Sequence, residues 1–140
     1  MAAQNIIHDQ MFLQRKSQPA TKADLNIAID LRDTLIAKRN LALGLAANMI
    51  GKDKRIIVFY VGPLAMVMIN PRIIDKEERY ITKEGCLSLS GERSTKRYKK
   101  IRVSFQTMNF ENRTQEFDGL TSEVIHHEID HCDGILIQKS

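Results

Sequence analysis

An amphipathic pattern near the start of the chain predicts the first helix. Apolar and small residues recur at helical spacing from Leu25 to Ile36, directly after Thr21-Lys22-Ala23-Asp24, which has the form of a capping box. Pro19 stands just upstream, and the residue before a proline is biased toward extended geometry. The pattern therefore predicts a helix from about Ala23 to Arg39.

The middle of the chain is rich in β-branched and aromatic residues, which favour strands. Three such runs extend from Arg55 to Val61, from Ala65 to Ile69 and from Lys100 to Phe110. Gly62-Pro63 and Asn70-Pro71 follow the first two runs as turn signals. These features predict antiparallel strands joined by turns.

A second helix is predicted near the end of the chain, from about Leu120 to Cys132. Thr121 or Ser122 is a candidate N-cap, and Asp133-Gly134 is a typical C-terminal boundary. Helical projection predicts one apolar face and an opposite polar face that carries Glu123, His126, Asp130 and Asp133. Two helices around a strand-rich middle indicate an α+β fold with an N-terminal helix, antiparallel strands and a C-terminal helix.

Composition narrows the class of protein without deciding its function. The 140 residues are 43% hydrophobic and 27% charged, with no repeat or linker, which predicts one globular domain over residues 1–140. No apolar run approaches the roughly 18 residues that a membrane span needs, and Met1 to Gln18 lacks the apolar stretch of a signal peptide. We therefore expect no membrane association and a cytoplasmic location.

The sequence His127-Glu128-Ile129-Asp130-His131 is an HExxH motif on the predicted closing helix. At roughly 100° per residue its two histidines lie about 40° apart, so both imidazoles can face one metal ion, with Glu128 beside them. Catalytic sites of this kind commonly use three protein ligands, and the residues after His131 include no histidine or glutamate. The third ligand must therefore come from upstream; without it, the motif is a chance match on a helix.

Two cysteines are available as a third ligand. Cys132 points about 100° away from its neighbour His131 on the helix, so we interpret it as a small buried apolar residue. Cys86 lies in Glu84-Gly85-Cys86-Leu87-Ser88, where a glycine allows close approach of the backbone to another element. A thiolate at Cys86 can complete a Cys-His-His set.

Three motifs together resemble the peptide deformylase family. EGCLS at Glu84 to Ser88 and HEIDH at His127 to His131 are similar to its second and third signature motifs. The segment from Ala42 to Met49 resembles its first motif, GxGxAAxQ, with two changes, and the similarity extends from about Gln18 to Leu136. An ordered set of three motifs is far more specific than HExxH alone.

The resemblance implies a hydrolase that removes the formyl group from N-formylmethionyl peptides of nascent proteins. One divalent ion would be bound by Cys86, His127 and His131; we expect Fe2+ in the cell, and Zn2+, Ni2+ or Co2+ also suit these ligands. Glu128 would be the general base, with the backbone N–H of Leu87 as one oxyanion donor. Candidates for an apolar methionine slot are Leu43, Gly44, Leu120 and Val124, together with His127.

The chain departs from the family pattern at several positions. Met49 replaces the glutamine that closes the first motif, and its side chain has no N–H to donate. Loss of one oxyanion donor typically lowers turnover by about 10²–10³. A non-catalytic or attenuated paralogue that binds metal and peptide is therefore the alternative. The amide of Asn48 is expected to point elsewhere, Ala42 replaces a glycine, and His126 is expected on the polar face rather than as a ligand.

The charge pattern leaves two further alternatives open. The formal net charge is +4, and Arg93 to Arg102 holds six basic residues within ten positions. A solvated strand edge is the favoured interpretation, with contact to RNA or the ribosome as the alternative. HExxH alone would also permit a metallopeptidase that cuts internal peptide bonds. The oligomeric state is not determined by these patterns.

Overall fold

The computed structural model describes residues 3–86 and 88–136, apart from the side chains of Leu89 and Ser90. The described residues form one antiparallel sheet in the order β1-β2-β3-β4-β5. The strands are β1 (Gly44–Ala46), β2 (Ile56–Val61), β3 (Leu64–Cys86), β4 (Leu89–Gln106) and β5 (Asn112–Asp118). The helices are α1 (Gln10–Leu13), α2 (Leu25–Ala37) and α3 (Gly119–Cys132), with short 3-10 helices η1 (Lys22–Asp24) and η2 (Ala47–Ile50). The predicted α+β class is confirmed.

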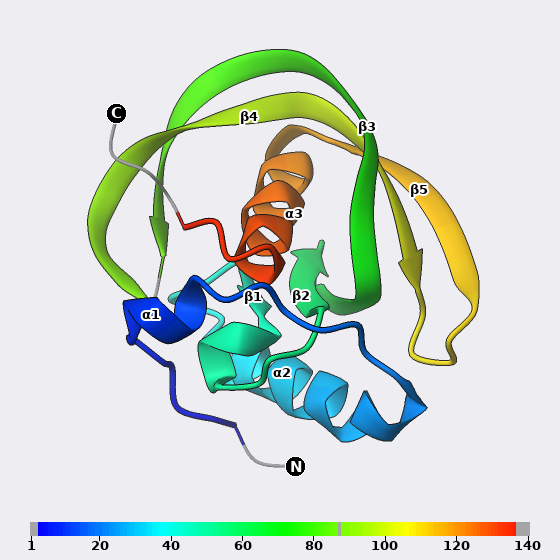
Figure 1. Cartoon of the computed structure of the whole chain (residues 1–140). Helices are drawn as coiled ribbons and strands as arrows, with labels where there is room; N and C mark the ends of the chain where they lie inside the picture. The colour runs from blue at the N-terminus through cyan, green and yellow to red at the C-terminus, as the bar shows by residue number, and fades with distance from the viewer. Residues whose placement is uncertain (1–2, 87, 137–140) are drawn as a thin grey trace.

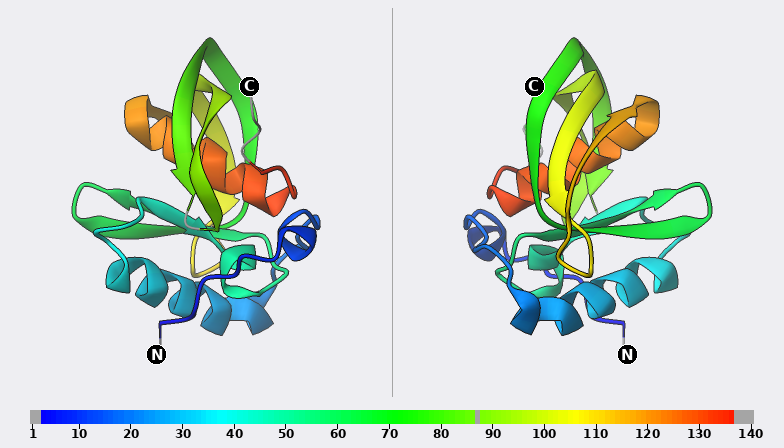
Figure 2. Two further views of the ribbon diagram at one scale, coloured as in Figure 1. Left: turned by 90° about the vertical axis from the view of Figure 1, so that its left-hand side faces the viewer. Right: turned by 90° about the vertical axis from the view of Figure 1, so that its right-hand side faces the viewer.

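The helix α3 is enclosed by the sheet. The long strands β3 and β4 curve over it (Figure 1), while α2 lies on the far side of β1 and β2 from α3 (Figure 2). Residues 56–59 of β2 are consecutively buried, as expected for a strand covered by a helix on each face. Leu31 and Leu35 of α2 and Ile125 of α3 belong to the same apolar core.

The first predicted helix is confirmed. It starts as η1 and continues as α2 to Ala37, two residues before the expected end. The backbone N–H of Thr21 donates to Asp24 Oδ2 at 2.8 Å, which is the reciprocal bond of the expected capping box. The local signal was therefore sufficient for this element.

One of the two predicted turns is wrong. Gly62-Pro63 does form a hairpin turn, because Val61 pairs with Leu64. Asn70-Pro71 instead lies inside β3, where the register shifts between Ile69 and Arg72. Asn70 has a positive φ of 53°, and its side-chain amide bonds to both the N–H and the carbonyl of Ala20. A proline cannot donate to the ladder, so the strand bulges here and continues.

The remaining strands extend beyond their predicted limits. The run from Lys100 to Phe110 only overlaps β4, which begins at Leu89, before the predicted start, and ends at Gln106, before the predicted end; β5 was not predicted. Most of the β3–β4 hairpin between residues 72 and 99 is exposed and highly charged. It therefore lacks the apolar alternation by which strands are recognised.

The closing helix is confirmed, but its predicted cap is wrong. The N-cap residue is Asp118, and Ser122 lies inside α3, where its hydroxyl donates to the Tyr98 carbonyl at 2.8 Å. The predicted end is correct, with Asp133 as C-cap and Gly134 at φ 74°. A Cβ at Gly134 would collide with the Gln14 carbonyl, so a glycine is needed for this close approach. No helix in the described residues is long and apolar enough to cross a bilayer.

Candidate metal centre and substrate pocket

The end of β3 and the middle of α3 bring one cysteine and two histidines together. Potential ligand atoms of Cys86, His127 and His131 all lie within 4.8 Å of one another. The Cys86 Sγ is 3.3 Å from His131 Nε2. Both histidines are buried, and Cys86 is half-buried. The arrangement unites a strand residue with two residues one helical turn apart.

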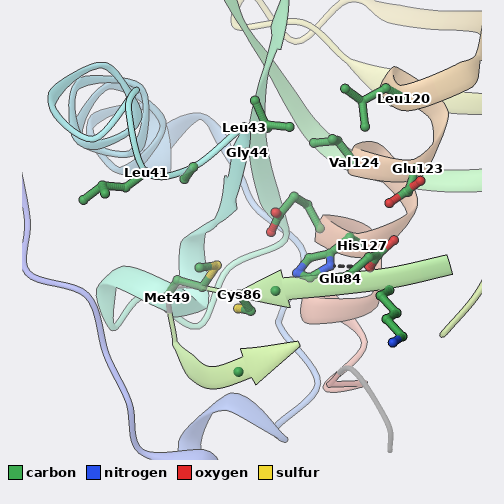
Figure 3. Close-up of a pocket in the computed structure, with 15 residues that line it drawn as sticks. Leu41, Leu43, Gly44, Met49, Glu84, Cys86, Leu120, Glu123, Val124 and His127 are labelled. Atoms are coloured by element: carbon green, nitrogen blue, oxygen red, sulfur yellow. Dashed lines mark hydrogen bonds and ion pairs between the residues drawn. The ribbon is translucent and has the colours of Figure 1, made fainter. Parts of the chain in front are cut away.

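A buried carboxylate orients one of these imidazoles. Glu84 Oε1 lies 2.7 Å from His127 Nδ1, so the carboxylate accepts from Nδ1 and leaves Nε2 directed at the cluster (Figure 3). Arg97 holds the same carboxylate in a bidentate pair, with both N···O distances 2.8 Å, and its Nη1 also bonds to Asp130 at 2.9 Å. This role of Glu84 and Arg97 was not predicted from the sequence; an acidic residue inside the EGCLS motif was the available signal.

The electrostatics of the cluster favour a cation. Burial alone would lower the pKa of His127, but the charge of Glu128 and the contacts with Cys86 and Glu84 outweigh it and raise the pKa to about 10. Burial lowers the pKa of His131 to about 3, so this imidazole is neutral, as a metal ligand must be. The site thus combines a neutral nitrogen donor with surroundings that stabilise positive charge.

Glu128 lies beside the cluster at the wall of a pocket. It is only 4% exposed, and its Oε1 has no hydrogen-bond partner among the described residues. Burial raises the pKa of this carboxyl to about 7. A carboxylate that is buried, unpaired and open to a pocket is suited to exchange a proton with a bound molecule.

The pocket has a volume of about 490 Å³ and an apolar side. Leu43, Gly44, Leu120 and Val124 line it, as expected from the sequence, and Figure 3 shows them grouped opposite Met49, Cys86 and His127. A Cβ at Gly44 would lie 2.8 Å from Val124 Cγ1 and 3.2 Å from Glu128 Cγ. Glycine at position 44 therefore allows β1 to approach α3 closely beside the pocket.

Met49 occupies the pocket wall near the cluster and is 1% exposed. Its thioether accepts a hydrogen bond from the Ala46 N–H at 3.5 Å and cannot donate one. The neighbouring Asn48 does not line the pocket, and its amide donates to the carbonyls of Leu13 (3.3 Å) and His131 (2.9 Å). Asn48 thus points elsewhere, as expected, and neither side chain offers a donor to the pocket.

Two other predicted positions have different outcomes. Leu87 lies outside the described residues. Ala42 does not have a positive φ. Its replacement of a glycine therefore causes no backbone strain.

The face of α3 that was predicted to be polar is not a solvent-exposed face at His126. His126 is buried, because the β3–β4 hairpin covers this side of the helix, and its ring stacks on Tyr98 with centroids 5.9 Å apart. Burial lowers the pKa of His126 to about 4. Asp130 on the same side pairs with Arg97. Cys132, in contrast, is a buried apolar residue as expected, with burial raising its thiol pKa to about 12.

The basic stretch from Arg93 to Arg102 is only partly available to a partner. Arg97 is buried in its ion pairs, and Lys100 and Arg102 both pair with Glu116 of β5. Lys96 and Lys99 remain exposed. Much of the positive charge apparent in the sequence is therefore balanced within the fold.

Fold and site together define an α+β protein that carries an HExxH helix and a strand cysteine in a Cys-His-His cluster able to hold a metal ion. The model of the polypeptide deformylase family matches residues 4–140. This chain belongs to that family.

Individual relatives agree in sequence and fold. The peptide deformylase of Clostridium beijerinckii is 52% identical over 132 residues, covering 94% of this chain and 97% of that protein. Among solved structures, the class I type b peptide deformylase from Acinetobacter baumannii superposes with a TM-score of 0.88 at 26% identity, covering 98% of both chains. The peptide deformylase from Thermotoga maritima gives 0.87 at 30% identity, covering 97% of this chain and 95% of that one.

Proposed function

We propose that this chain is a metal-dependent hydrolase that removes the formyl group from N-formylmethionyl peptides of nascent proteins. The main support is the Cys-His-His cluster next to the buried Glu128, whose Oε1 has no hydrogen-bond partner among the described residues, at the wall of a partly apolar pocket. The relatives share the family name, and one related structure, from Acinetobacter baumannii, is bound to Met-Ala-Ser. That tripeptide is what formyl-Met-Ala-Ser becomes after losing its formyl group.

The residues of the cluster fit a divalent ion. A soft thiolate from Cys86 and two imidazoles, from His127 and His131, form a donor set suited to iron, zinc, cobalt or nickel, and we propose Fe2+ in the cell. An ion bound there supplies Lewis-acid chemistry, which polarises a carbonyl and lowers the pKa of a coordinated water toward 7. Glu84 fixes the orientation of His127 for this task.

Glu128 is the proposed general base. Its carboxylate takes a proton from water as the oxygen adds to the formyl carbon, and it returns the proton to the amide nitrogen as the C–N bond breaks. Formate and a free amino terminus are the products. The backbone N–H of Leu87 is the proposed oxyanion donor, and the side of the pocket formed by Leu43, Gly44, Leu120 and Val124 is the proposed slot for methionine.

A second candidate function is an attenuated or non-catalytic deformylase paralogue. Met49 favours this alternative because it places a thioether, which cannot donate a hydrogen bond, at the pocket. The side-chain amide of Asn48 does not replace the missing donor, because it donates to the carbonyls of Leu13 and His131. Release of formate from formyl-Met-Ala-Ser by the iron-loaded protein, kept anaerobic and analysed for metal, separates the two. Absence of formate in a sample with one equivalent of iron would favour the paralogue.

Two wider features complete the proposal. The whole chain acts as a single catalytic domain in the cytoplasm, where formylated nascent chains are made. Contact with the ribosome through the stretch from Arg93 to Arg102 stays a prediction, now centred on Lys96 and Lys99. Loss of salt-dependent cosedimentation with ribosomes in a Lys96→Ala, Lys99→Ala variant would support it, and unchanged cosedimentation would count against it.

A further inference from the structure

The segment before α2, residues 4–18, packs against the parts of the chain that form the metal centre, although the proposed reaction does not use it. The backbone N–H of Ile7 donates to the Met49 carbonyl at 2.7 Å. Further along the segment, the backbone N–H of Ser17 donates to the Cys132 carbonyl at 2.8 Å, where the segment passes the end of α3 (Figure 1). The segment is therefore bonded both to η2 and to the helix that carries the HExxH motif.

A histidine extends these contacts to the EGCLS motif. The Nδ1 atom of His8 lies 3.2 Å from the backbone carbonyl oxygen of Ser88. Because a carbonyl oxygen can only accept a hydrogen bond, the imidazole donates from Nδ1. Ser88 follows Cys86 by two residues and is only 3% exposed, although His8 itself lies at the surface. His8 thus joins the N-terminal segment to the stretch that begins with a candidate metal ligand.

The Ser88 carbonyl has to find its partner outside the sheet. The chain reverses direction here, since Cys86 pairs with Leu89 and the register shifts between Gly85 and Cys86. A carbonyl within such a reversal has no place in the strand ladder, and a buried backbone carbonyl needs a donor. The Ser88 hydroxyl has no hydrogen-bond partner among the described residues, so it does not fix the reversal either. The donor comes from His8.

The reversal matters for the chemistry because of its neighbours in the sequence. Cys86 precedes it, and the backbone N–H of Leu87, the proposed oxyanion donor, belongs to the residue between Cys86 and Ser88. A donor stabilises a developing oxyanion only when it is held in place before the reaction. A bond to the next carbonyl along the chain restricts the motion of this stretch. His8 does not line the pocket, so its influence is indirect.

We propose that His8 is a positioning residue, which holds the reversal of the EGCLS motif from the N-terminal segment in the geometry that the oxyanion requires. The effect on turnover rests on the proposed deformylase function. The effect on the order of the reversal does not, because it follows from the hydrogen bond alone.

Three substitutions of His8 separate the hydrogen bond from the bulk of the ring. His8→Ala removes the donor, while the bond between Ile7 and Met49 keeps the segment attached. His8→Asn should preserve the contact, because its amide nitrogen is as far from Cβ along the side chain as the Nδ1 of histidine. His8→Gln places the same amide one bond further out and should not. Met11→Ala is the control, since Met11 lies on the same segment and is 82% exposed.

Hydrogen–deuterium exchange of peptides that cover residues 84–92 tests the order of the reversal. His8→Ala and His8→Gln are expected to speed this exchange by about three- to tenfold, as for the loss of one ordinary hydrogen bond. His8→Asn and Met11→Ala should match the wild type. Exchange in residues 25–37 of α2 should be the same in all samples. Unchanged exchange of residues 84–92 in His8→Ala would overturn the inference, as would an equal increase in α2, which would indicate general destabilisation.

Steady-state kinetics with formyl-Met-Ala-Ser tests the consequence for the reaction at matched metal content. His8→Ala and His8→Gln are expected to lower kcat by about three- to tenfold with KM unchanged, because an oxyanion contact forms in the transition state. His8→Asn should restore the wild-type rate. Equally slow His8→Asn and His8→Ala enzymes would contradict a role of the donor, and a raised KM with unchanged kcat would assign the effect to substrate binding instead.

Failure of the proposed function would be recognised separately. Absence of formate from the iron-loaded wild-type protein would reject the deformylase itself. The exchange comparison needs no turnover, so it would still decide whether His8 holds the reversal. Normal turnover of the wild type together with unaltered exchange in His8→Ala would instead reject the positioning role alone.

Discussion

Glu84 Oε1 lies 2.7 Å from His127 Nδ1, so the carboxylate determines which ring nitrogen of this histidine faces Cys86. Because Glu84 is also held by two bonds from Arg97, its position is set by β4 as well as by its own strand. The orientation of a helical histidine thus depends on two strands of the sheet. The same contact provides a way to test the metal centre without changing a ligand.

Glu84→Gln is expected to lower the affinity for Zn2+ by about 10- to 100-fold, as is typical when the partner that orients a metal-binding imidazole is altered. Competition with a chromophoric chelator measures the affinity. Glu116→Gln serves as a charge-matched control, because the ion pairs of Glu116 in the described part of the chain are those with Lys100 and Arg102 on the surface. Equal zinc affinities of the wild type and Glu84→Gln would contradict a role of this contact.

Arg97→Met is expected to destabilise the protein by about 3–5 kcal/mol, because it leaves the carboxylates of Glu84 and Asp130 without their buried partner. The free energy of unfolding in urea measures the effect. Arg102→Met is the matched control: its exposed pair with Glu116 should contribute less than about 1 kcal/mol. Similar losses in the two variants would show that burial of Arg97 carries no special weight.

Glu128→Ala is expected to reduce kcat for formyl-Met-Ala-Ser by at least about 10²-fold while the metal content stays unchanged. The reason is that Glu128 is the buried carboxylate at the pocket that has an oxygen free to take a proton. Formate release and metal analysis on one sample provide both values. Retained turnover would rule out Glu128 as the base.

Met49→Gln is expected to raise kcat by up to about 10²-fold, because it introduces an amide donor where the thioether offers none. Met49→Leu keeps the position apolar and should leave the rate near that of the wild type. A faster Met49→Gln enzyme with unchanged KM would locate the effect in the chemical step. No gain would indicate that the chain stabilises the oxyanion without a donor at position 49.

Gly44→Ala is expected to lower kcat/KM and to destabilise the fold by about 1–3 kcal/mol, since the added Cβ would lie 2.8 Å from Val124 Cγ1 and 3.1 Å from the Val58 carbonyl. Gly85→Ala is the matched control, because the nearest atom to its Cβ is 3.8 Å away. Thermal unfolding and formate release measure the two effects. Equal behaviour of both variants would mean that space at Gly44 is not limiting.

Local patterns in the sequence predicted the elements whose determinants are near neighbours in the chain. The HExxH spacing placed His127 and His131 on one face of a helix, and Gly62-Pro63 gave a correct hairpin turn. Both results follow from the geometry of a few consecutive residues. Patterns of this kind also supported the capping interaction at Thr21 and the end of α3 at Gly134.

Only the tertiary structure decided which distant residues meet. The β3–β4 hairpin buries Arg97 and His126 although both belong to polar stretches of sequence, and it carries Glu84 and Cys86 to the face of α3. The turn expected at Asn70-Pro71 is instead a bulge within β3, where the pairing with β4 shifts register. Burial and charge balance depend on atoms contributed by other segments, so a periodic pattern within one segment determines an element but not its surroundings.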